Sequence, residues 1–238
     1  MSSEGFIEAC SAAARSEIIV RDAKTATRPK WSVHLLSSTL HMRLFVALDI
    51  DQEIRDRIAS FLGDMRGLAP AVRWVQPESL HVTLKFIGER PDPMVKDIEN
   101  TLRGISPGSF QLAFRGAGFF PTAKSARVFW IGIQADATLA ELAAQIERSL
   151  VPLGIEAEKR AFSPHLTLAR AGNGSGAPGR QKDDRPNQRF SALQTKLSTM
   201  PSPDFGTMSA AEFFLYRSQL SSRGAQYTKI ARFPLSTP

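Results

Sequence analysis

Residues 80–87 (LHVTLKFI) and residues 164–169 (PHLTLA) repeat one pattern in two distant parts of the chain. In both copies a histidine and a threonine alternate with branched apolar residues, which is typical of a β-strand with one apolar and one polar face. The histidine and the threonine therefore share one face of each strand. A rigid strand that holds an imidazole beside a hydroxyl is a platform for polar chemistry.

Strand-like and helical stretches alternate around the two copies from residue 42 onward. Apolar runs of strand length occupy residues 43–50, 72–75, 80–87, 110–114, 128–133, 165–169, 211–217 and 227–233. Apolar residues at helical spacing occupy residues 51–66, 93–102, 138–150 and 190–200. Groups of strands with interspersed helices and short connections predict an α+β fold built on mainly antiparallel sheets.

The composition is that of an ordinary globular protein, with 42% apolar and 22% charged residues in 238. This length holds one domain or two small lobes, and the composition excludes fibrous and wholly disordered classes. The single cysteine, Cys10, excludes an intrachain disulfide and a thiolate zinc site, so we expect a cytoplasmic location. No run of about 18 apolar residues and no apolar signal-peptide region occurs, so we expect neither a membrane span nor secretion.

The charge balance favours an anionic partner. Lys and Arg number 30 against 23 Asp and Glu, which gives a formal net charge of +7. Nucleic acid would fit this excess, although a solvated basic surface has the same signature.

Two segments lack a sustained apolar period. We interpret residues 1–41 as a poorly ordered N-terminal extension that precedes a single domain at residues 42–238. Its acidic residues argue against a transit peptide, and the alternative is that Met42 is the physiological start. Residues 171–189, which are rich in Gly, Pro and charge, predict a mobile loop.

The two histidine motifs suggest a chemistry if the fold brings their strands together. One neutral imidazole, at His81 or His165, could take a proton from an attacking oxygen, while the other, as imidazolium, protonates the leaving oxygen. The hydroxyls of Thr83 and Thr167 could hold the phosphoryl oxygens. This set of groups suits phosphate ester chemistry and requires no metal.

Other interpretations of these residues are less favoured. A single histidine-threonine pair is usually a half-exposed polar pair of a strand, but two copies are harder to explain in this way. A metal site would have only His81 and His165 as ligands, because no Asp or Glu lies within two residues of either. The chain lacks a P-loop, a G-x-S-x-G elbow and a Rossmann fingerprint in its strand-to-helix setting.

At these residues the chain resembles the 2H phosphoesterases, and within them the RNA 2′,3′-cyclic phosphodiesterases, long called 2′-5′ RNA ligases. The resemblance extends over essentially residues 42–238. It rests on the stretches MRLFVALD (42–49), VRWV (72–75), LHVTLKFIG (80–88), FSPHLTLAR (162–170) and FLYRSQL (214–220), and on the closing residues 227–235.

The resemblance implies a bilobal fold, in which two pseudo-symmetric antiparallel sheets flanked by helices enclose a central cleft, with one motif from each lobe. It implies hydrolysis of a terminal RNA 2′,3′-cyclic phosphate to a 2′-phosphomonoester, with reversible 2′-5′ joining in some members. Matched by motif, His81 would be the proton donor and His165 the proton acceptor that activates water. Thr83 and Thr167 would bind the phosphate oxygens, and no cofactor or metal is implied.

Several further positions have two interpretations. Arg170 resembles a basic family residue that helps to bind phosphate, but strict strand alternation turns it away from the cleft, so a bulge would be needed to redirect it. Lys85 shares the polar face of the first motif by alternation, and it could add positive potential or face solvent. Phe45, Trp74 and Phe119 could stack on a nucleobase or belong to the core.

Other classes of function stay open beside the enzyme. The chain could be an RNA- or nucleotide-binding module of the same fold without turnover, a phosphodiesterase for another cyclic or 2′-linked substrate, or a basic protein that binds an acidic partner. The intact histidine and threonine of both motifs favour an enzyme. We expect a monomer that acts on RNA with a 2′,3′-cyclic phosphate terminus, with no membrane and no obligatory protein partner.

Overall fold

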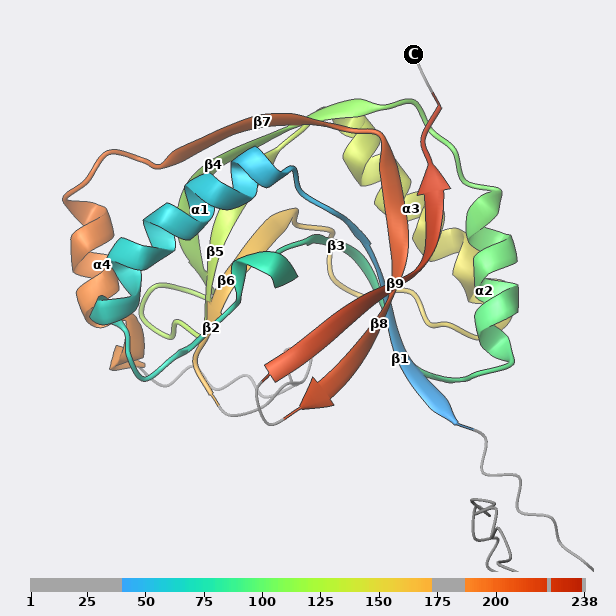
Figure 1. Ribbon diagram of the computed structural model, residues 1–238, viewed down its shortest axis with the longest axis horizontal. Coiled ribbons are helices and arrows are strands. Elements are labelled where there is room, and N and C mark those ends of the chain that lie inside the picture. The colour runs from blue at the N-terminus through green and yellow to red at the C-terminus, as the bar shows by residue number, and fades with distance from the viewer. Residues whose placement is uncertain (1–39, 173–186, 222–223, 237–238) are drawn as a thin grey trace, which may run out of the picture. The chain divides into compact units, whose positions relative to one another are not determined.

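The computed structural model describes residues 40–172, 187–221 and 224–236, which form two antiparallel β-sheets flanked by four α-helices (Figure 1). The predicted α+β fold on antiparallel sheets is therefore confirmed. All but the last two residues of the predicted extension at 1–41, and most of the predicted loop at 171–189, lie outside the described residues.

Sheet A has four strands in the order β3-β1-β8-β9, and sheet B has five in the order β2-β6-β5-β4-β7. The strands of sheet A are β3 (Val82–Pro91), β1 (His41–Leu48), β8 (Glu212–Ser221) and β9 (Gly224–Pro234). The strands of sheet B are β2 (Arg73–Trp74), β6 (His165–Arg170), β5 (Val128–Gln134), β4 (Phe110–Phe120) and β7 (Asp204–Ala210). Neighbouring strands run antiparallel in both sheets.

The two sheets have equivalent strand orders. β3, β1, β8 and β9 of sheet A correspond in order to β6, β5, β4 and β7 of sheet B. His81 directly precedes β3 of sheet A, and His165 is the first residue of β6 of sheet B. The strand next to each of them, β1 or β5, leads into a helix. The pseudo-symmetry that the resemblance implies is thus present, with β2 as an additional edge strand of sheet B.

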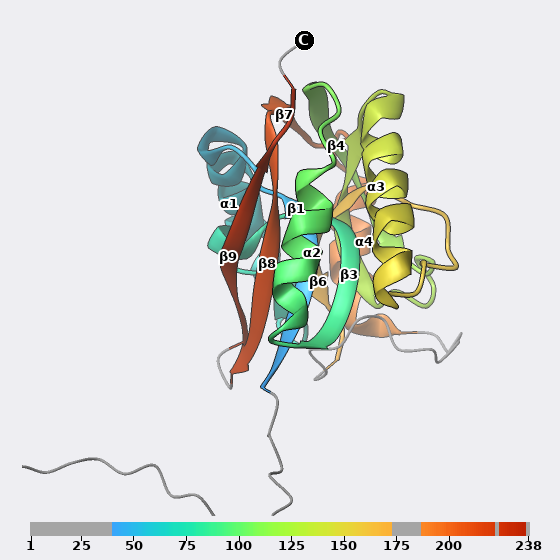
Figure 2. The ribbon, with the colours of Figure 1, turned by 90° about the vertical axis from the view of Figure 1, so that its right-hand side faces the viewer.

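Two of the four helices cross from one sheet to the other. The four helices are α1 (Gln52–Met65), α2 (Met94–Arg103), α3 (Ala137–Leu150) and α4 (Ser191–Ser198). α1 follows β1 of sheet A but packs against β7 of sheet B, whereas α3 follows β5 of sheet B but packs against β3 of sheet A. α2 lies beside α3 at sheet A (Figure 2).

The helices form where apolar periodicity and capping predict them. Ile54, Ile58 and Leu62 of α1 recur every four residues and are fully buried, so one stripe of the helix faces the core. Asp136 caps α3, since its carboxylate accepts a hydrogen bond of 2.9 Å from the backbone N–H of Thr138.

One continuous apolar core lies between the elements and includes residues of both sheets and all four helices. A second, smaller cluster of Phe45, Ala47, Phe214 and Tyr216 lies on the other face of sheet A. This second face of sheet A, together with the face of sheet B that carries His165, is called the histidine face below. The core packs the two lobes into one unit, and on the histidine face the smaller cluster of sheet A lies beside His81.

The sequence did not predict β7. Its buried residues, Phe205, Met208 and Ala210, do not alternate regularly. Gly206 takes a positive φ of 100° and lies where the pairing with β4 shifts register. The irregularity breaks the period of two by which the other strands are recognised.

Candidate active site

The same backbone contact holds both motif histidines. Nδ1 of His81 lies 2.8 Å from the carbonyl oxygen of Ser79, and Nδ1 of His165 lies 2.7 Å from that of Ser163. Because a carbonyl oxygen only accepts, each Nδ1 carries a proton and donates it. Each neutral ring therefore keeps Nε2 as the atom that accepts a proton or, once charged, gives one.

The two imidazoles have different neighbours. The ring centroid of His81 is 4.7 Å from that of Phe45 and 5.0 Å from that of Tyr227, whereas His165 meets Phe120 edge-on at 5.0 Å. Burial lowers the pKa of His81 to about 4, and burial also lowers the pKa of His165. Both histidines are therefore neutral in the free protein at neutral pH.

A β-bulge turns Arg170 toward the histidine face. Two consecutive residues of β5 pair with Thr167 and Ala169, so Leu168 is an extra residue of β6. After Leu168 the side chains of β6 again alternate between the two faces of the sheet, so Arg170 shares the face of Thr167. Nη2 of Arg170 lies 3.4 Å from Oγ1 of Thr167. The structure thus contains the bulge that a phosphate-binding role for Arg170 requires.

Arg170 also links the two motifs. After burial, its positive charge is a further cause of the lowered pKa of both His81 and His165, so the guanidinium lies within electrostatic range of both rings. β3 and β6 contact each other although they belong to different sheets. Thr83 and Thr167 follow the two histidines by two residues, and both are partly exposed. The structure therefore brings together the residues of the two motifs that the sequence singled out.

The first motif has a bulge at the same place, and it makes the prediction for Lys85 wrong. Thr83 and Lys85 pair with consecutive residues of β1, so Leu84 is the extra residue. Lys85 turns away from the histidine face and is only 5% exposed. Its Nζ lies 2.6 Å from Oε2 of Glu147 and 2.7 Å from the carbonyl oxygen of Glu156. Lys85 therefore ties β3 to α3 and to the segment that leads into the second motif.

Sequence reasoning missed Phe86, the residue of the first motif that corresponds to Arg170. Each stands three residues after the motif threonine and just beyond a bulge. Phe86 is 45% exposed, and its ring centroid is 6.1 Å from that of Phe45. An exposed aromatic ring beside the candidate site offers a stacking surface for a base.

The three aromatic residues that the sequence offered for stacking all contact other aromatic rings. Phe45 is 2% exposed. Trp74 donates through Nε1 to a backbone carbonyl at 3.1 Å, and its ring meets Phe129. Phe119 packs against Phe129 and Phe190. Trp74 and Phe119 pack against the core but stay partly exposed, and Phe45 lies on the histidine face in ring contact with His81.

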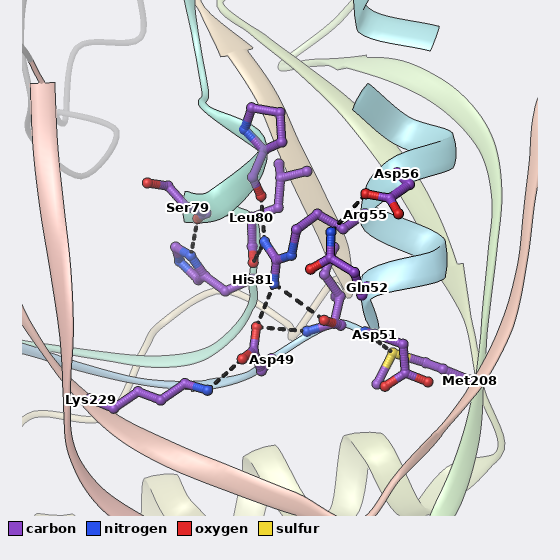
Figure 3. Close-up of polar contacts among 12 residues, drawn as sticks. Asp49, Asp51, Gln52, Arg55, Asp56, Ser79, Leu80, His81, Met208 and Lys229 are labelled. Carbon is purple, nitrogen blue, oxygen red and sulfur yellow. Dashed lines mark hydrogen bonds and ion pairs between the residues drawn. The ribbon is translucent and has the colours of Figure 1, made fainter. Parts of the chain in front are cut away.

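An arginine of α1 holds the turn that precedes His81 (Figure 3). Nη1 of Arg55 donates to the carbonyl oxygens of Pro77 and Leu80, the latter at 3.4 Å. Ser79, whose carbonyl oxygen accepts from His81, lies between these two residues. Arg55 therefore fixes the backbone that orients the imidazole.

A carboxylate just after the end of β1 completes this network. Oδ1 of Asp49 lies 2.7 Å from Nη2 of Arg55, and its other oxygen accepts from Lys229 of β9 (Figure 3). Burial acts to raise the pKa of Asp49, but the hydrogen bonds from Lys229 and from the N–H of Ile50, with the nearby positive charges, lower it overall. Asp49 therefore stays ionised and anchors Arg55.

Within the described ranges, no three His, Cys, Asp or Glu side chains gather as a set of metal ligands. No helix of this part of the chain is both long enough and apolar enough to cross a membrane.

The duplication seen in the fold also appears in comparison with known proteins. The family described as LigT like Phosphoesterase matches the chain twice, over residues 48–130 and over residues 131–225. Each match contains one of the two histidine motifs. The chain belongs to the LigT-like phosphoesterase family.

Three similar proteins match this chain over nearly their whole length. The RNA 2′,3′-cyclic phosphodiesterase of Methanothermobacter thermautotrophicus is 32% identical over 200 residues, covering 82% of this chain and 100% of the relative. The protein of the same name from Archaeoglobus fulgidus is 34% identical over 192 residues, covering 81% and 99%. The crystal structure of E. coli LigT complexed with 3′-AMP has a TM-score of 0.65 and 27% identity, covering 83% of this chain and 99% of that chain.

Proposed function

We propose that this LigT-like protein hydrolyses the 2′,3′-cyclic phosphate end of RNA to a 2′-phosphomonoester, with His81 and His165 as the proton-transfer groups and without a metal ion. The matched pair of imidazoles carries the proposal, because each has Nδ1 bound to a carbonyl oxygen and Nε2 left for proton transfer. The names of the curated relatives support the choice of substrate.

The proposed reaction moves one proton at each histidine. Nε2 of His165 takes a proton from water as the water oxygen attacks phosphorus. The bond between phosphorus and O3′ breaks, and Nε2 of His81 gives its proton to O3′, so the phosphate stays on O2′. Exchange of protons with solvent restores both rings. A 5′-hydroxyl in place of water would give 2′-5′ ligation by the same transfers.

The remaining site residues have proposed roles in binding. The hydroxyls of Thr83 and Thr167 and the guanidinium of Arg170 hold the non-bridging phosphate oxygens, where negative charge grows during attack. Phe86 provides the stacking surface for the terminal base.

The donor role of His81 depends on the substrate. A proton donor must carry its proton when O3′ leaves, yet the pKa of His81 is about 4 in the free protein. A phosphate anion close to the ring favours the imidazolium form. We therefore expect His81 to take up its proton together with the substrate, while the neutral His165 already suits the base.

The experiment that tests the proposal is product analysis by ³¹P NMR on a short RNA with a 2′,3′-cyclic phosphate end, in excess EDTA. The wild type should give a 2′-phosphate, and His81→Ala and His165→Ala should each be slower by about a hundredfold to ten-thousandfold. Circular dichroism of the variants controls for folding. Loss of activity in EDTA with recovery on adding a divalent metal would refute the metal-free mechanism. A folded wild type that binds the RNA but leaves the cyclic end intact would favour the binding-module class.

A further inference from the structure

An arginine of the two-residue strand β2 shares a face of sheet B with the second histidine motif. Arg73 stands directly opposite Arg170 in the pairing of β2 with β6, and residues that are directly opposite lie on the same face. The next residue, Trp74, packs against the core, and its ring meets that of Phe129. Because successive side chains of a strand point to opposite faces, Arg73 lies on the histidine face.

Arg73 and Arg170 form a pair of like charges. Directly opposed residues of antiparallel strands have Cβ atoms about 4.5–5.5 Å apart. Burial lowers the pKa of Arg170 and the positive charge of Arg73 lowers it further, while Tyr227 acts to raise it. Like charges at this separation repel, and an anion bound between the two guanidinium groups would offset the repulsion.

This pair has different neighbours from other cations near the two motifs. The residues directly opposite Arg170 in its two neighbouring strands are Arg73 and Val128, neither of which is acidic. Other cations nearby have a carboxylate as partner or directly opposite: Arg55 and Lys229 contact Asp49, Lys85 contacts Glu147, and Arg43 stands opposite Glu89. The strand register thus gathers positive charge at Arg73 and Arg170.

The charge of Arg73 also reaches the first motif. Burial raises the pKa of Tyr227, while the positive charges of Arg170, Arg43 and Arg73 act to lower it. The ring of Tyr227 in turn meets that of His81 edge-on, with 5.0 Å between their centroids. Arg73 of sheet B therefore lies within electrostatic range of a ring of sheet A that contacts the proposed proton donor.

The two arginines lie at different depths. Arg170 is partly buried and its guanidinium contacts the hydroxyl of Thr167, whereas Arg73 is exposed. In the proposed reaction the cyclic phosphate meets the inner guanidinium, beside the two imidazoles. The next negative charge of an RNA strand is the phosphodiester on O5′ of the same nucleotide, and the exposed guanidinium is the neighbouring cation for it.

We propose that Arg73 binds the phosphodiester on O5′ of the reacting nucleotide while Arg170 holds the cyclic phosphate, so that the site selects the end of an RNA strand over a free nucleoside 2′,3′-cyclic phosphate. This inference rests on the proposed function. A guanidinium fork matches the two free oxygens of a phosphodiester. Because a phosphate contact carries no base information, the preference applies to strands of any sequence.

The test compares kcat/KM for two nucleoside 2′,3′-cyclic phosphates that differ only at O5′, which is a free hydroxyl in one and carries a methyl phosphate in the other. The methyl phosphate is the smallest phosphodiester, so the comparison separates one phosphate from the contacts of a second nucleoside. The wild type should prefer the methyl phosphate substrate by about tenfold. Because Arg73 is exposed, this preference should shrink as the salt concentration rises.

Arg73→Gln is compared with Arg148→Gln, which removes an exposed arginine of α3. In Arg73→Gln the ratio of the two kcat/KM values should fall from about ten to about one, through loss of activity on the methyl phosphate substrate. Arg148→Gln should keep the ratio of the wild type. Circular dichroism controls for folding of both variants.

Equal kcat/KM of the wild type on the two substrates would overturn this inference alone, and that result depends on no variant. An equal loss on both substrates in folded Arg73→Gln would overturn it as well, because Arg73 would then act on the reacting phosphate. So would a ratio in Arg73→Gln that matches the wild type. A wild type that hydrolyses neither substrate, nor a cyclic-phosphate RNA, would overturn the proposed function, and this inference with it.

Discussion

The neutral imidazole of His81 makes the folded state sensitive to acid. Its pKa is about 4 in the fold, against the ordinary histidine value of 6.5 in the unfolded chain. Between these values the unfolded chain binds more protons than the folded one, so stability falls as the pH falls. The contribution is fully present above about pH 6.5 and is lost progressively toward pH 4.

We predict that lowering the pH from 7 to 5 costs the wild type about 2 kcal/mol of stability through His81. His81→Gln keeps a polar side chain but does not titrate in this range, so the stability that the variant loses between pH 7 and pH 5 should be smaller by about 2 kcal/mol. Urea unfolding at the two pH values measures the free energy of unfolding of the wild type and of the variant. The same loss in wild type and variant would show that His81 does not titrate as the structure indicates.

At the scale of the element, the two matched bulges decide which side chains reach the site. After the bulge of β6 the side chains again alternate between the two faces of the strand, and Arg170 faces Thr167. After the bulge of β3, Phe86 is exposed and Lys85 packs inside. The same kind of bulge thus presents the guanidinium of Arg170 in the second motif and the ring of Phe86 in the first. This asymmetry suits a ligand with a phosphate at one end and a base at the other.

Removal of the Arg170 charge should raise the pKa of both His81 and His165, because that charge is one of the causes that lower them. Arg170→Gln should also lower kcat/KM by about tenfold to a hundredfold, from loss of a charged hydrogen bond to phosphate. NMR titration of the two imidazoles measures the first effect, with Arg148→Gln as the control. Unchanged imidazole pKa values in folded Arg170→Gln would place the guanidinium outside the site.

Arg55 acts at the same scale as a positioning residue, since it holds the turn before His81 rather than the substrate. Arg55→Ala should lower kcat about tenfold with little change in KM, because orientation and not binding is lost. Arg57→Ala is the matched control, as this arginine of the same helix contacts Glu53 and Phe205 instead. An effect on KM alone would assign Arg55 to substrate binding.

At the scale of the whole molecule, the crossing of α1 and α3 between sheets makes the site depend on both halves of the chain. The sequence predicted the antiparallel α+β fold and the pairing of histidine with threonine, because both follow from alternation along one strand. It could not predict the orientations of Lys85 and Arg170, since a bulge depends on the register with a partner strand. The contacts of Arg55 with the turn likewise depend on tertiary packing.

The rates of wild type, His81→Ala, His165→Ala and the double variant on a cyclic-phosphate RNA test the central claim most directly. If the two imidazoles work as one unit, each single variant should be slower by about a hundredfold to ten-thousandfold, and the double variant only slightly slower than either. Single-turnover assays separate this effect from binding. Independent losses that multiply in the double variant, or a single variant with wild-type rate, would contradict the two-histidine mechanism.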